Sequence, residues 1–435
     1  MLFKKYISVD IGSKKTKIVC GRVKNNTVEI IEYAIIDTPW DSIIDGKIVD
    51  FYALNEVLKA TLKENKIKGR YLLFIITGTA IISRDVQLPD STDEELGKIL
   101  KYEAQQYFPV DLNSYVVDYR PLEKVTTGEG VFIKVQLIAV PQKQVDEYVK
   151  FASFLKKEIV SIDIGANSLN RFLFPQSFLE NKFQKTENAS EDQGSGVAVL
   201  DVGYETIGVS IFNQGVLKFQ RNLLNGFKDI SSTLKNQMAG KANINPSPPN
   251  NSQADFSQVE LRFGETLGEV QQKDQNLIGA LSNSDITDTE HTNIITDEEA
   301  TVKTSSFTFD ELATTHVPFR SAEYSIETKD VDLDNPDVQN VLSPVLDIIL
   351  MDLQRFFDFY NTRSNGNRIS KIYLYGGGCR INGLKEYIER HFNLETDYLS
   401  TENSINFSNV VYKGTKPDFE DCFPLLVNAI GSLIR

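Results

Sequence analysis

The chain has 435 residues and a formal net charge of −14 at pH 7, which argues against a surface that binds the phosphate backbone of nucleic acid. Its length allows about two to four domains, each large enough to bury a core. Cys20, Cys379 and Cys422 are far apart and form no CxxC pair, so neither a disulfide framework nor a zinc site is indicated. No apolar run reaches the length of a membrane span, and we expect a soluble intracellular protein.

The first part of the chain alternates short β-rich runs with helical patterns, as α/β proteins do. The patterns predict strands at Tyr6–Asp10, Thr16–Val23, Val28–Ile36 and Tyr71–Ile76, and a helix at about Leu54–Lys63. Between Ile82 and Ala139 we expect a small inserted unit. It has strands at Ile82–Leu88, Tyr115–Pro121 and Phe132–Val140, and a helix that starts after Ser91-Thr92-Asp93 and ends near Tyr107.

The second part of the chain is interrupted by polar sequence. Residues 182–196 predict a linker, and residues 240–330 have too few apolar residues to offset the entropy of folding. The remaining sequence predicts strands at Ile207–Phe212, Val216–Leu223 and Ile372–Tyr375, and helices at about Asp229–Met238, from Asn335-Pro336 onward, and at Pro424–Ile434.

One local pattern occurs twice. Asp201-Val202-Gly203 lies between two apolar strands, and Asp10-Ile11-Gly12 has the same setting near the N-terminus. Each turn places a carboxylate beside backbone that a ligand can approach, because glycine lacks a Cβ and its N–H can point outward. A single copy is more often an ordinary hairpin. Two copies indicate duplicated halves that face each other across a cleft.

A glycine turn follows the strand Ile372–Tyr375. Gly376, Gly377 and Gly378 would let backbone amides reach a ligand at the N-terminus of the next helix, where the helix dipole favours an anion. Taken alone, the stretch is equally compatible with a tight turn that binds nothing.

Two β–DxG–β hairpins followed by a strand–GGG–helix unit resemble the actin-like ATPase superfamily. The flanking sequence resembles its PilM family of type IV pilus assembly proteins, which are relatives of the cell-division protein FtsA. The similar segments are Arg84–Pro89, Glu103–Pro109, Tyr119, Leu137–Pro141, Val145–Val149, Phe357–Tyr360, Gly376–Leu384 and Ala429–Arg435. The resemblance implies an α/β, actin-like (ribonuclease H-like, duplicated) ATPase fold with an inserted small α+β subdomain.

The resemblance also implies a division of the chain. Residues 1–81 and 141–181 would form the first actin-like domain, with residues 82–140 as the inserted FtsA/PilM-type subdomain. Residues 182–196 would be the linker, and residues 197–239 would carry the second hairpin in the second domain. Residues 240–330 would be a largely disordered insertion, and residues 331–435 would complete the second domain and return to the first.

For the cleft, the resemblance implies bound ATP and Mg²⁺. Asp10 and Asp201 would hold Mg²⁺ mainly through water, because this ion keeps most of its hydration shell. The other residues assigned to the nucleotide are Gly12, Ser13, Lys14, Lys15 and Thr16 on one side of the phosphates, Gly203 and Thr206 on the other, and Asn225, Gly226, Gly376, Gly377, Gly378, Arg380 and Asn382 toward the nucleoside. We expect only one of Lys14 and Lys15 to reach phosphate, and the Thr206 hydroxyl could equally bond to backbone.

No residue stands out as a catalytic base. Asp163 ends a strand that enters the cleft, but an aspartate at that place is usually a helix cap. In relatives, an acidic helix and a lysine contact the ribose and base, and here residues 240–330 intervene, with only a faint similarity at Gly264–Lys273. Base and ribose contacts therefore stay open. We expect an ATP-binding protein with weak or absent ATPase activity, and the sequence does not give the rate of hydrolysis.

The resemblance implies a cytoplasmic component of the type IV pilus inner-membrane assembly platform. Its partner would be the N-terminal cytoplasmic segment of a PilN-like single-span membrane protein, bound near the helix Asp93–Tyr107. That partner would hold the chain at the inner face of the membrane without insertion. Leu96, Leu100, Ala104 and Tyr107 are expected to be mostly core of the inserted unit. Contacts with other platform or motor proteins, and self-association, stay open.

Two alternatives remain. An FtsA-like division scaffold would need an amphipathic tail, whereas this sequence stops at Arg435. A small-molecule kinase on the same fold would need a catalytic carboxylate and a substrate pocket.

Overall fold

The computed structural model describes residues 4–24, 27–128, 130–174, 196–238, 326–364, 366–400 and 410–434. These residues belong to one unit, made of Met1–Ile244 and Ile326–Arg435. The predicted linker up to residue 195, the predicted disordered stretch from 240 to 325, and the similarity at Gly264–Lys273 lie outside the described residues.

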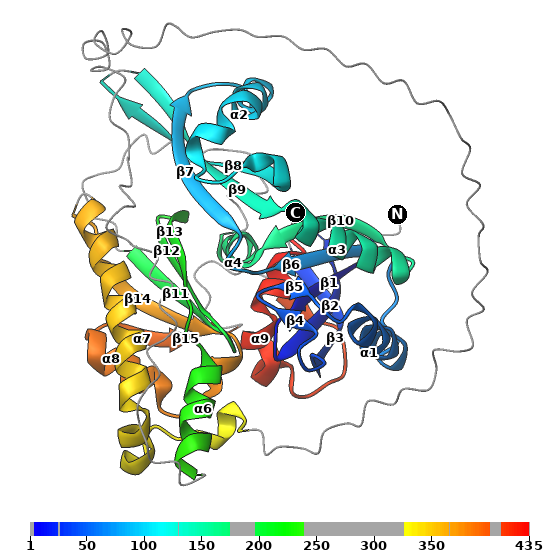
Figure 1. Cartoon of the computed structure of the whole chain (residues 1–435), viewed down its shortest axis with the longest axis vertical. Coiled ribbons are helices and arrows are strands. Elements are labelled where there is room, and N and C mark those ends of the chain that lie inside the picture. The colour runs from blue at the N-terminus through cyan, green and yellow to red at the C-terminus, as the bar shows by residue number, and fades with distance from the viewer. Residues whose placement is uncertain are drawn as a thin grey trace, which may run out of the picture. The chain divides into compact units, whose positions relative to one another are not determined.

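The first sheet combines an antiparallel meander with parallel strands (Figure 1). The meander consists of β1 (Tyr6–Ile11), β2 (Lys15–Lys24) and β3 (Thr27–Asp37), and its strands are the three predicted there. The strands β6 (Tyr71–Ile76) and β10 (Glu158–Ile164) extend it parallel to β1, and β16 (Val410–Tyr412) pairs with β3. The order is β10-β6-β1-β2-β3-β16.

The second sheet repeats this arrangement. The strands β11 (Gly196–Val202), β12 (Ile207–Asn213) and β13 (Val216–Leu223) form the meander, and β14 (Ile369–Tyr375) and β15 (Glu395–Tyr398) extend it in parallel. Its order, β13-β12-β11-β14-β15, matches β3-β2-β1-β6-β10 strand for strand. The duplication predicted from the two hairpins is thus confirmed at the level of whole sheets.

The inserted unit forms a sheet of its own, with the order β7-β9-β8. It contains β7 (Ile82–Pro89), α2 (Asp93–Tyr107), β8 (Tyr115–Thr127) and β9 (Gly130–Pro141). The helix α2 starts at a reciprocal cap, in which Thr92 Oγ1 accepts from Glu95 N at 3.4 Å and Glu95 accepts from Thr92 N at 2.8 Å. Leu96, Leu100 and Ala104 are buried, as expected for core residues of this unit.

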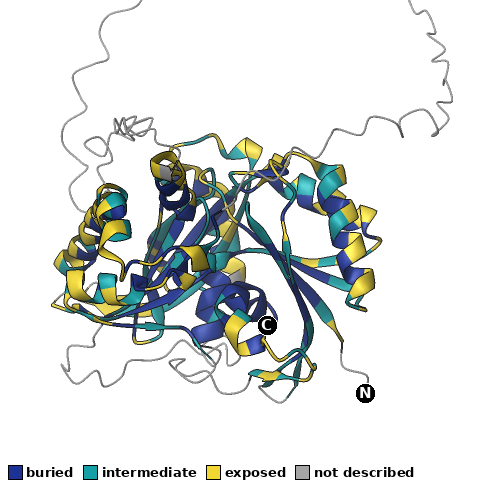
Figure 2. Cartoon of the chain, turned by 90° about the horizontal axis from the view of Figure 1, so that it is seen from below, coloured by how far each residue is buried: buried dark blue, intermediate teal, exposed yellow. Residues whose placement is uncertain are grey.

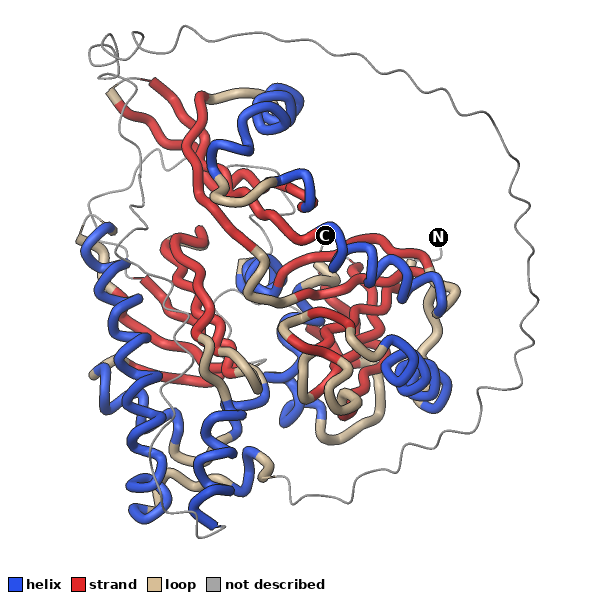
Figure 3. Tube along the Cα trace, in the orientation of Figure 1, coloured by secondary structure: helices blue, strands red, loops and turns tan. Residues whose placement is uncertain are grey.

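Helices pack on both sheets with their buried residues toward the strands, and some of them lie between the two sheets (Figures 2 and 3). Their bounds are α1 (Phe51–Glu64), α3 (Gln142–Phe154), α4 (Gly165–Leu173), α6 (Phe227–Met238), α7 (Pro336–Arg363), α8 (Leu384–Phe392) and α9 (Phe419–Gly431). A small hairpin of β4 (Ile43–Ile44) and β5 (Lys47–Ile48) precedes α1. Among the described residues, no helix is both long and apolar enough to cross a membrane.

The last helix differs from its prediction. It begins at Phe419 rather than at Pro424 and ends at Gly431, so Pro424 lies inside it. The Pro424 carbonyl accepts from Gly376 N at 3.0 Å, which ties the helix to the glycine turn of the second sheet. A proline inside a helix lacks the N–H for the helical bond, and its ring crowds the carbonyl four residues earlier. The helix continues through Pro424 despite this cost.

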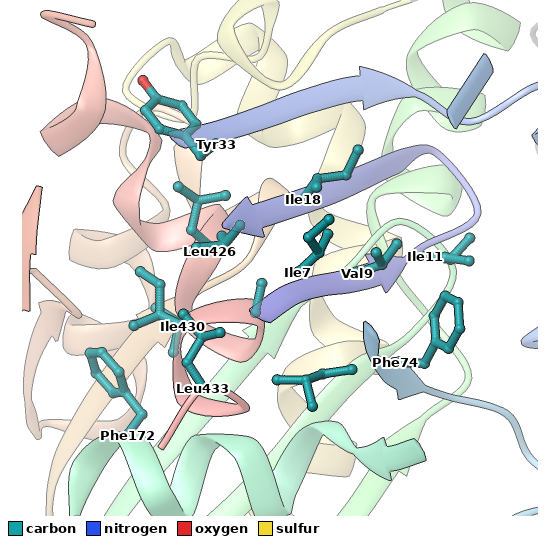
Figure 4. Close-up of a cluster of buried hydrophobic side chains, with 14 of the residues drawn as sticks. Ile7, Val9, Ile11, Ile18, Tyr33, Phe74, Phe172, Leu426, Ile430 and Leu433 are labelled. Atoms are coloured by element: carbon teal, nitrogen blue, oxygen red, sulfur yellow. The ribbon is translucent and has the colours of Figure 1, made fainter. Parts of the chain in front are cut away.

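The helix α9 carries the chain back to the first sheet and closes its core. Leu426, Ile430 and Leu433 lie beside Ile7 and Ile18 in the same buried cluster (Figure 4). A hydrogen bond of 2.7 Å between the hydroxyls of Ser432 and Ser8 satisfies polar groups within this core.

Gly431→Ala should destabilise the protein, because a Cβ at this position would collide with the backbone carbonyl of Ser168 in α4. Overpacking of this kind costs about 1–3 kcal/mol or more. Thermal or urea unfolding measures the effect, and Gly128→Ala is the control, because a Cβ at that position would have no atom within 4 Å. Equal stability of the two variants would show that α4 and α9 are packed less tightly than described.

Candidate functional site

The two DxG turns have the same internal geometry. Gly12 N donates to Lys15 O at 3.1 Å, and Gly203 N donates to Thr206 O at 3.0 Å. A Cβ would lie 3.0 Å from Lys15 O at Gly12 and 2.7 Å from Thr206 O at Gly203, so close approach within the turn favours glycine. The expectation that these N–H groups point outward to a ligand is wrong, because each bonds inside its own turn.

The carboxylates of both turns face one cavity of about 910 Å³, a volume typical of a small-molecule site. Asp10 lies 3.2 Å from Lys17 Nζ. Asp201 accepts from Asn428 Nδ2 at 3.1 Å. Burial raises the pKa of Asp201 to about 6, and the nearby Asp10 charge acts in the same direction, while Lys17 and the hydrogen bonds from Asn428 and Tyr375 oppose it.

The strand register explains why the two carboxylates differ. Asp10 is paired across the hairpin with Lys17, whereas Asp201 is paired with Gly208. The first carboxylate therefore has a cation beside it on its own hairpin, and the second has none at the matching position. Opposite charges across a strand pair stabilise each other, and of the two aspartates Asp10 has such a partner directly across its hairpin.

The remaining residues of the first hairpin separate into two groups. Ser13, Lys14 and Lys15 line the cavity. Lys15 forms an ion pair of 2.7 Å with Asp37 on β3. The Thr16 hydroxyl is buried and lies 2.8 Å from that of Thr38, so it supports the turn from behind rather than facing the cavity.

Lys14 reaches across the cavity to the second half of the protein. Its Nζ lies 3.5 Å from Glu327 and 5.6 Å from the centre of the Tyr204 ring. Tyr204 belongs to the second DxG turn, and Glu327 precedes a 3₁₀ helix, η2 (Thr328–Asp330). One side chain of the first turn is thus held by two contacts with the opposite half.

The helix α6 fixes the second turn. Phe227 N donates to Gly203 O at 3.1 Å and Lys228 N donates to Tyr204 O at 2.8 Å. These bonds start the helix two residues before the predicted Asp229. A Cβ on Gly226 would lie 2.5 Å from Tyr204 O, so this glycine lets the helix approach the turn.

The glycine turn after β14 does not lead directly into a helix. Gly377–Arg380 forms a 3₁₀ helix, η3, and α8 begins only at Leu384. Gly376 has a φ of 88°, and a Cβ there would collide with Asp201 Oδ1. No atom lies within 4 Å of a Cβ placed on Gly377, which borders the cavity. Gly376 therefore leaves room for the Asp201 carboxylate, and Gly377 lines the cavity.

The structure brings many of the predicted site residues to one cavity. Those that line it are Asp10, Gly12, Ser13, Lys14, Lys15, Asp201, Gly203, Thr206, Gly377, Gly378 and Arg380. Those that lie outside its lining are Thr16, Asn225, Gly226, Gly376 and Asn382. The Asn382 side chain instead donates to Asp332 at 2.6 Å, where it holds the segment that precedes α7.

The polar residues of the cavity that sequence reasoning missed include those that contact the two aspartates: Lys17, Tyr375 and Asn428. The predicted hairpin could have been used to find Lys17. If its strands are paired residue by residue away from the turn, Lys17 lies opposite Asp10. Asn428 is a lone amide in an apolar helix, a pattern that often marks a buried polar contact. Its amide bonds to Asp201, and its oxygen accepts from Tyr375 Oη at 3.1 Å.

The donors at the cavity suit Mg²⁺ better than a metal that needs a cage of protein ligands. Within the described ranges, no group of three or more His, Cys, Asp or Glu side chains gathers as a metal site. Asp10 and Asp201 supply carboxylate oxygens, and Mg²⁺ is usually held by one or two carboxylates, several waters and a substrate phosphate. Asp163 lies outside the lining, where it pairs with Arg171 at 2.5 Å and accepts from Asn167 at 3.0 Å.

A family of sequences described as type IV pilus assembly protein PilM matches residues 8–246 and 316–431 of this chain. A solved structure described as the PilM-PilN type IV pilus biogenesis complex is 16% identical and has a TM-score of 0.65 over 99% of this chain and 98% of that chain. This likeness shows a shared fold.

Two further solved structures are similar at a lower score. The ethanolamine utilization protein EutJ from Carboxydothermus hydrogenoformans is 11% identical, with a TM-score of 0.46 over 100% of this chain and 90% of that chain. MreB5 of Spiroplasma citri bound to ADP is 13% identical, with a TM-score of 0.39 over 93% of each chain.

Asp201→Asn should stabilise the metal-free protein at pH 7.5 by on the order of 1–3 kcal/mol, because it removes a buried charge. Burial raises the folded-state pKa of Asp201 from its ordinary value of 3.8 to about 6. The contribution of Asp201 to the free energy of unfolding of the wild type therefore falls as the pH rises from 3.8 to about 6. Near pH 4 the carboxyl group is protonated in the folded protein, and the stability difference between variant and wild type should disappear. Urea unfolding with a chelator present, at several pH values, measures this. A gain that does not change with pH would contradict it.

Proposed function

We propose that this chain, which belongs to the PilM family of type IV pilus assembly proteins, is a nucleotide-controlled adaptor. It binds ATP with Mg²⁺ in the cavity between the DxG turns and docks on the N-terminal cytoplasmic segment of a PilN-like membrane protein. The observation that carries the nucleotide proposal is the convergence of two matching turns, each with its aspartate, on one cavity. The actin-like fold is a duplicated architecture in keeping with that arrangement.

Asp10 and Asp201 would hold Mg²⁺, which when bound neutralises phosphate charge. Lys17 lies beside Asp10, and its charge also acts on Asp201. The positive charge of Lys17 therefore partly balances the two carboxylates in the metal-free protein. Thr206 and Gly203 of the second turn line the same cavity as Ser13 and Lys14 of the first, so the two turns would border a ligand from both halves.

Lys14 would couple occupancy to closure. Its ammonium group contacts Glu327 and the Tyr204 ring, and both belong to the second half. A phosphate group competes for the same cation through a stronger, charge-assisted contact. Nucleotide would thus redirect Lys14 from a protein contact to a ligand contact, and this would alter how the halves are held together.

A small-molecule kinase has less support. Such an enzyme needs a carboxylate that is free to act on a bound hydroxyl. Asp163, the aspartate considered from the sequence, is engaged by Arg171 and Asn167. We therefore propose nucleotide binding and closure as the function of the cavity and leave hydrolysis out of the proposal.

For the partner, we propose the region of the inserted unit. In the sheet β7-β9-β8, both β7 and β8 are outer strands, and an extended peptide can add to a sheet edge through main-chain hydrogen bonds. The solved complex of similar fold contains PilM and PilN, which supports this class of partner. Such a partner would place the chain at the cytoplasmic face of the membrane.

Asp10→Asn and Asp201→Asn should each weaken binding of Mg²⁺-ATP by about tenfold or more, because each removes a charged oxygen ligand. The thermal shift caused by ATP should fall with the affinity, since a ligand stabilises only the form it binds. Calorimetric titration measures both variants beside Asp146→Asn, an exposed aspartate of α3 outside the cavity lining. Unchanged affinity in both cavity variants would refute the assignment.

A labelled peptide with the first dozen or so residues of the partner should bind the intact chain and lose binding to a chain that lacks residues 82–139. The inserted unit has a hydrophobic core of its own, so the rest of the chain should keep its cooperative unfolding. Fluorescence anisotropy measures the peptide, and thermal unfolding is the control. Equal binding to both chains would place the docking site elsewhere.

A further inference from the structure

The strand edge remote from the cavity carries a concentration of cations. The strands β1, β6 and β10 are parallel neighbours, and Asp10, Ile76 and Ile164 at their C-terminal ends line the cavity. The residues just before their N-terminal ends are basic and mostly exposed: Lys4, Lys5, Lys66, Lys68, Arg70, Lys156 and Lys157. We call these residues the basic edge. It is formed on a chain whose formal net charge is −14.

The basic edge is built by three separate stretches of sequence that the sheet brings side by side (Figure 1). Tyr71 lies at its centre, with Lys4 Nζ 5.1 Å and the Arg70 guanidinium 5.8 Å from its ring centre. Glu158 pairs with Arg70 at 2.8 Å. Glu64, the last residue of α1, is a second exposed carboxylate near the edge. The seven cations outnumber these two carboxylates, so the edge is positive.

Two of these lysines occupy backbone positions that normally favour glycine. The helices α1 and α3 end in the same way, with Ile67 N donating to Leu62 O at 2.9 Å and Lys157 N donating to Ala152 O at 3.1 Å. The residue that turns the chain in each case is a lysine, Lys66 or Lys156, with a φ of 53°. Glycine adopts this left-handed conformation freely, whereas a side chain is strained there.

A simpler explanation is that these lysines complement the negative ends of the helix dipoles. It accounts for the charge at the ends of α1 and α3. It does not account for Lys4 and Lys5, which lie directly before β1, or for Lys68, which lies beyond the turn that ends α1. Cations that precede strands and cations that follow helices therefore lie on one surface. Two of them, Lys66 and Lys156, have a left-handed backbone conformation that strains a residue with a side chain.

We propose that the basic edge is a contact surface for anionic lipid headgroups of the membrane. Lysine is a compact, hydrated point charge suited to a fluid layer of phosphates, and lysines near such a surface attract it over about a Debye length. The choice of lipid over an acidic protein rests on the membrane-side location in the proposed function. The contact itself needs no nucleotide and no insertion into the bilayer.

The test is sedimentation of the full chain with vesicles of phosphatidylcholine that contain about a third phosphatidylglycerol. At about 0.1 M salt we expect binding that is lost with pure phosphatidylcholine and at about 0.5 M salt. Lys66→Glu, Lys68→Glu and Lys156→Glu together should reduce the affinity by about tenfold or more. The control is Lys98→Glu, Lys101→Glu and Lys143→Glu, which changes net charge equally at exposed positions of α2 and α3.

A second variant separates binding from stability. Lys66→Gly with Lys156→Gly should keep or raise the melting temperature, because glycine relieves the left-handed strain, while vesicle binding falls. Absence of wild-type binding at low salt, or equal binding by the two triple variants, would overturn the proposal. Tighter binding to polyglutamate than to the vesicles would also overturn it, in favour of an acidic protein partner. Each of these results leaves the titrations with ATP and partner peptide unaffected.

Discussion

The site depends on two carboxylates that share one cavity, with Lys17 of the first hairpin beside them. Asp10 has Lys17 as its direct cross-strand partner, and Asp201 has the amide of Asn428. Burial disfavours the charge on Asp201, and Asp10 increases that cost. A divalent cation between the two carboxylates would offset both the cost of burying the Asp201 charge and its repulsion by Asp10. The arrangement is therefore costly without metal and favourable with it, which is the physical basis of the nucleotide proposal.

The surrounding structure holds these groups in place. The N-terminus of α6 bonds to Gly203 and Tyr204 of the second turn, and the first turn is held by Thr38, whose hydroxyl donates to Gly12 O at 2.7 Å. The helix α9 contributes Asn428 on one side and packs on the first sheet on the other. A helix that belongs to the core of the first half thus positions a carboxylate of the second. Movement between the halves would change the environment of Asp201.

The sequence predicts what depends on local pattern. The two turns, the meanders and the inserted unit follow from alternation of apolar residues and from Asp-x-Gly, and the matching order of the two sheets confirms the duplication. Residue roles that depend on distant contacts could not be read in this way. Asn428 meets Asp201 across 227 residues of sequence, and Asn382 bonds to Asp332 beside α7 rather than lining the cavity. The predicted start of α9 was wrong because Pro424 was treated as a first helical residue, whereas the helix begins at Phe419 and contains it.

The central claim is that both aspartates serve one metal–nucleotide site. The most direct measurement is a crystal structure of the chain with a non-hydrolysable ATP analogue and Mn²⁺, in which anomalous scattering locates the ion. The account predicts one ion in the cavity, bound directly or through water to Asp10 and Asp201, with the phosphates between the two DxG turns. An ion and phosphates bound away from either aspartate, or a nucleotide outside this cavity, would contradict it.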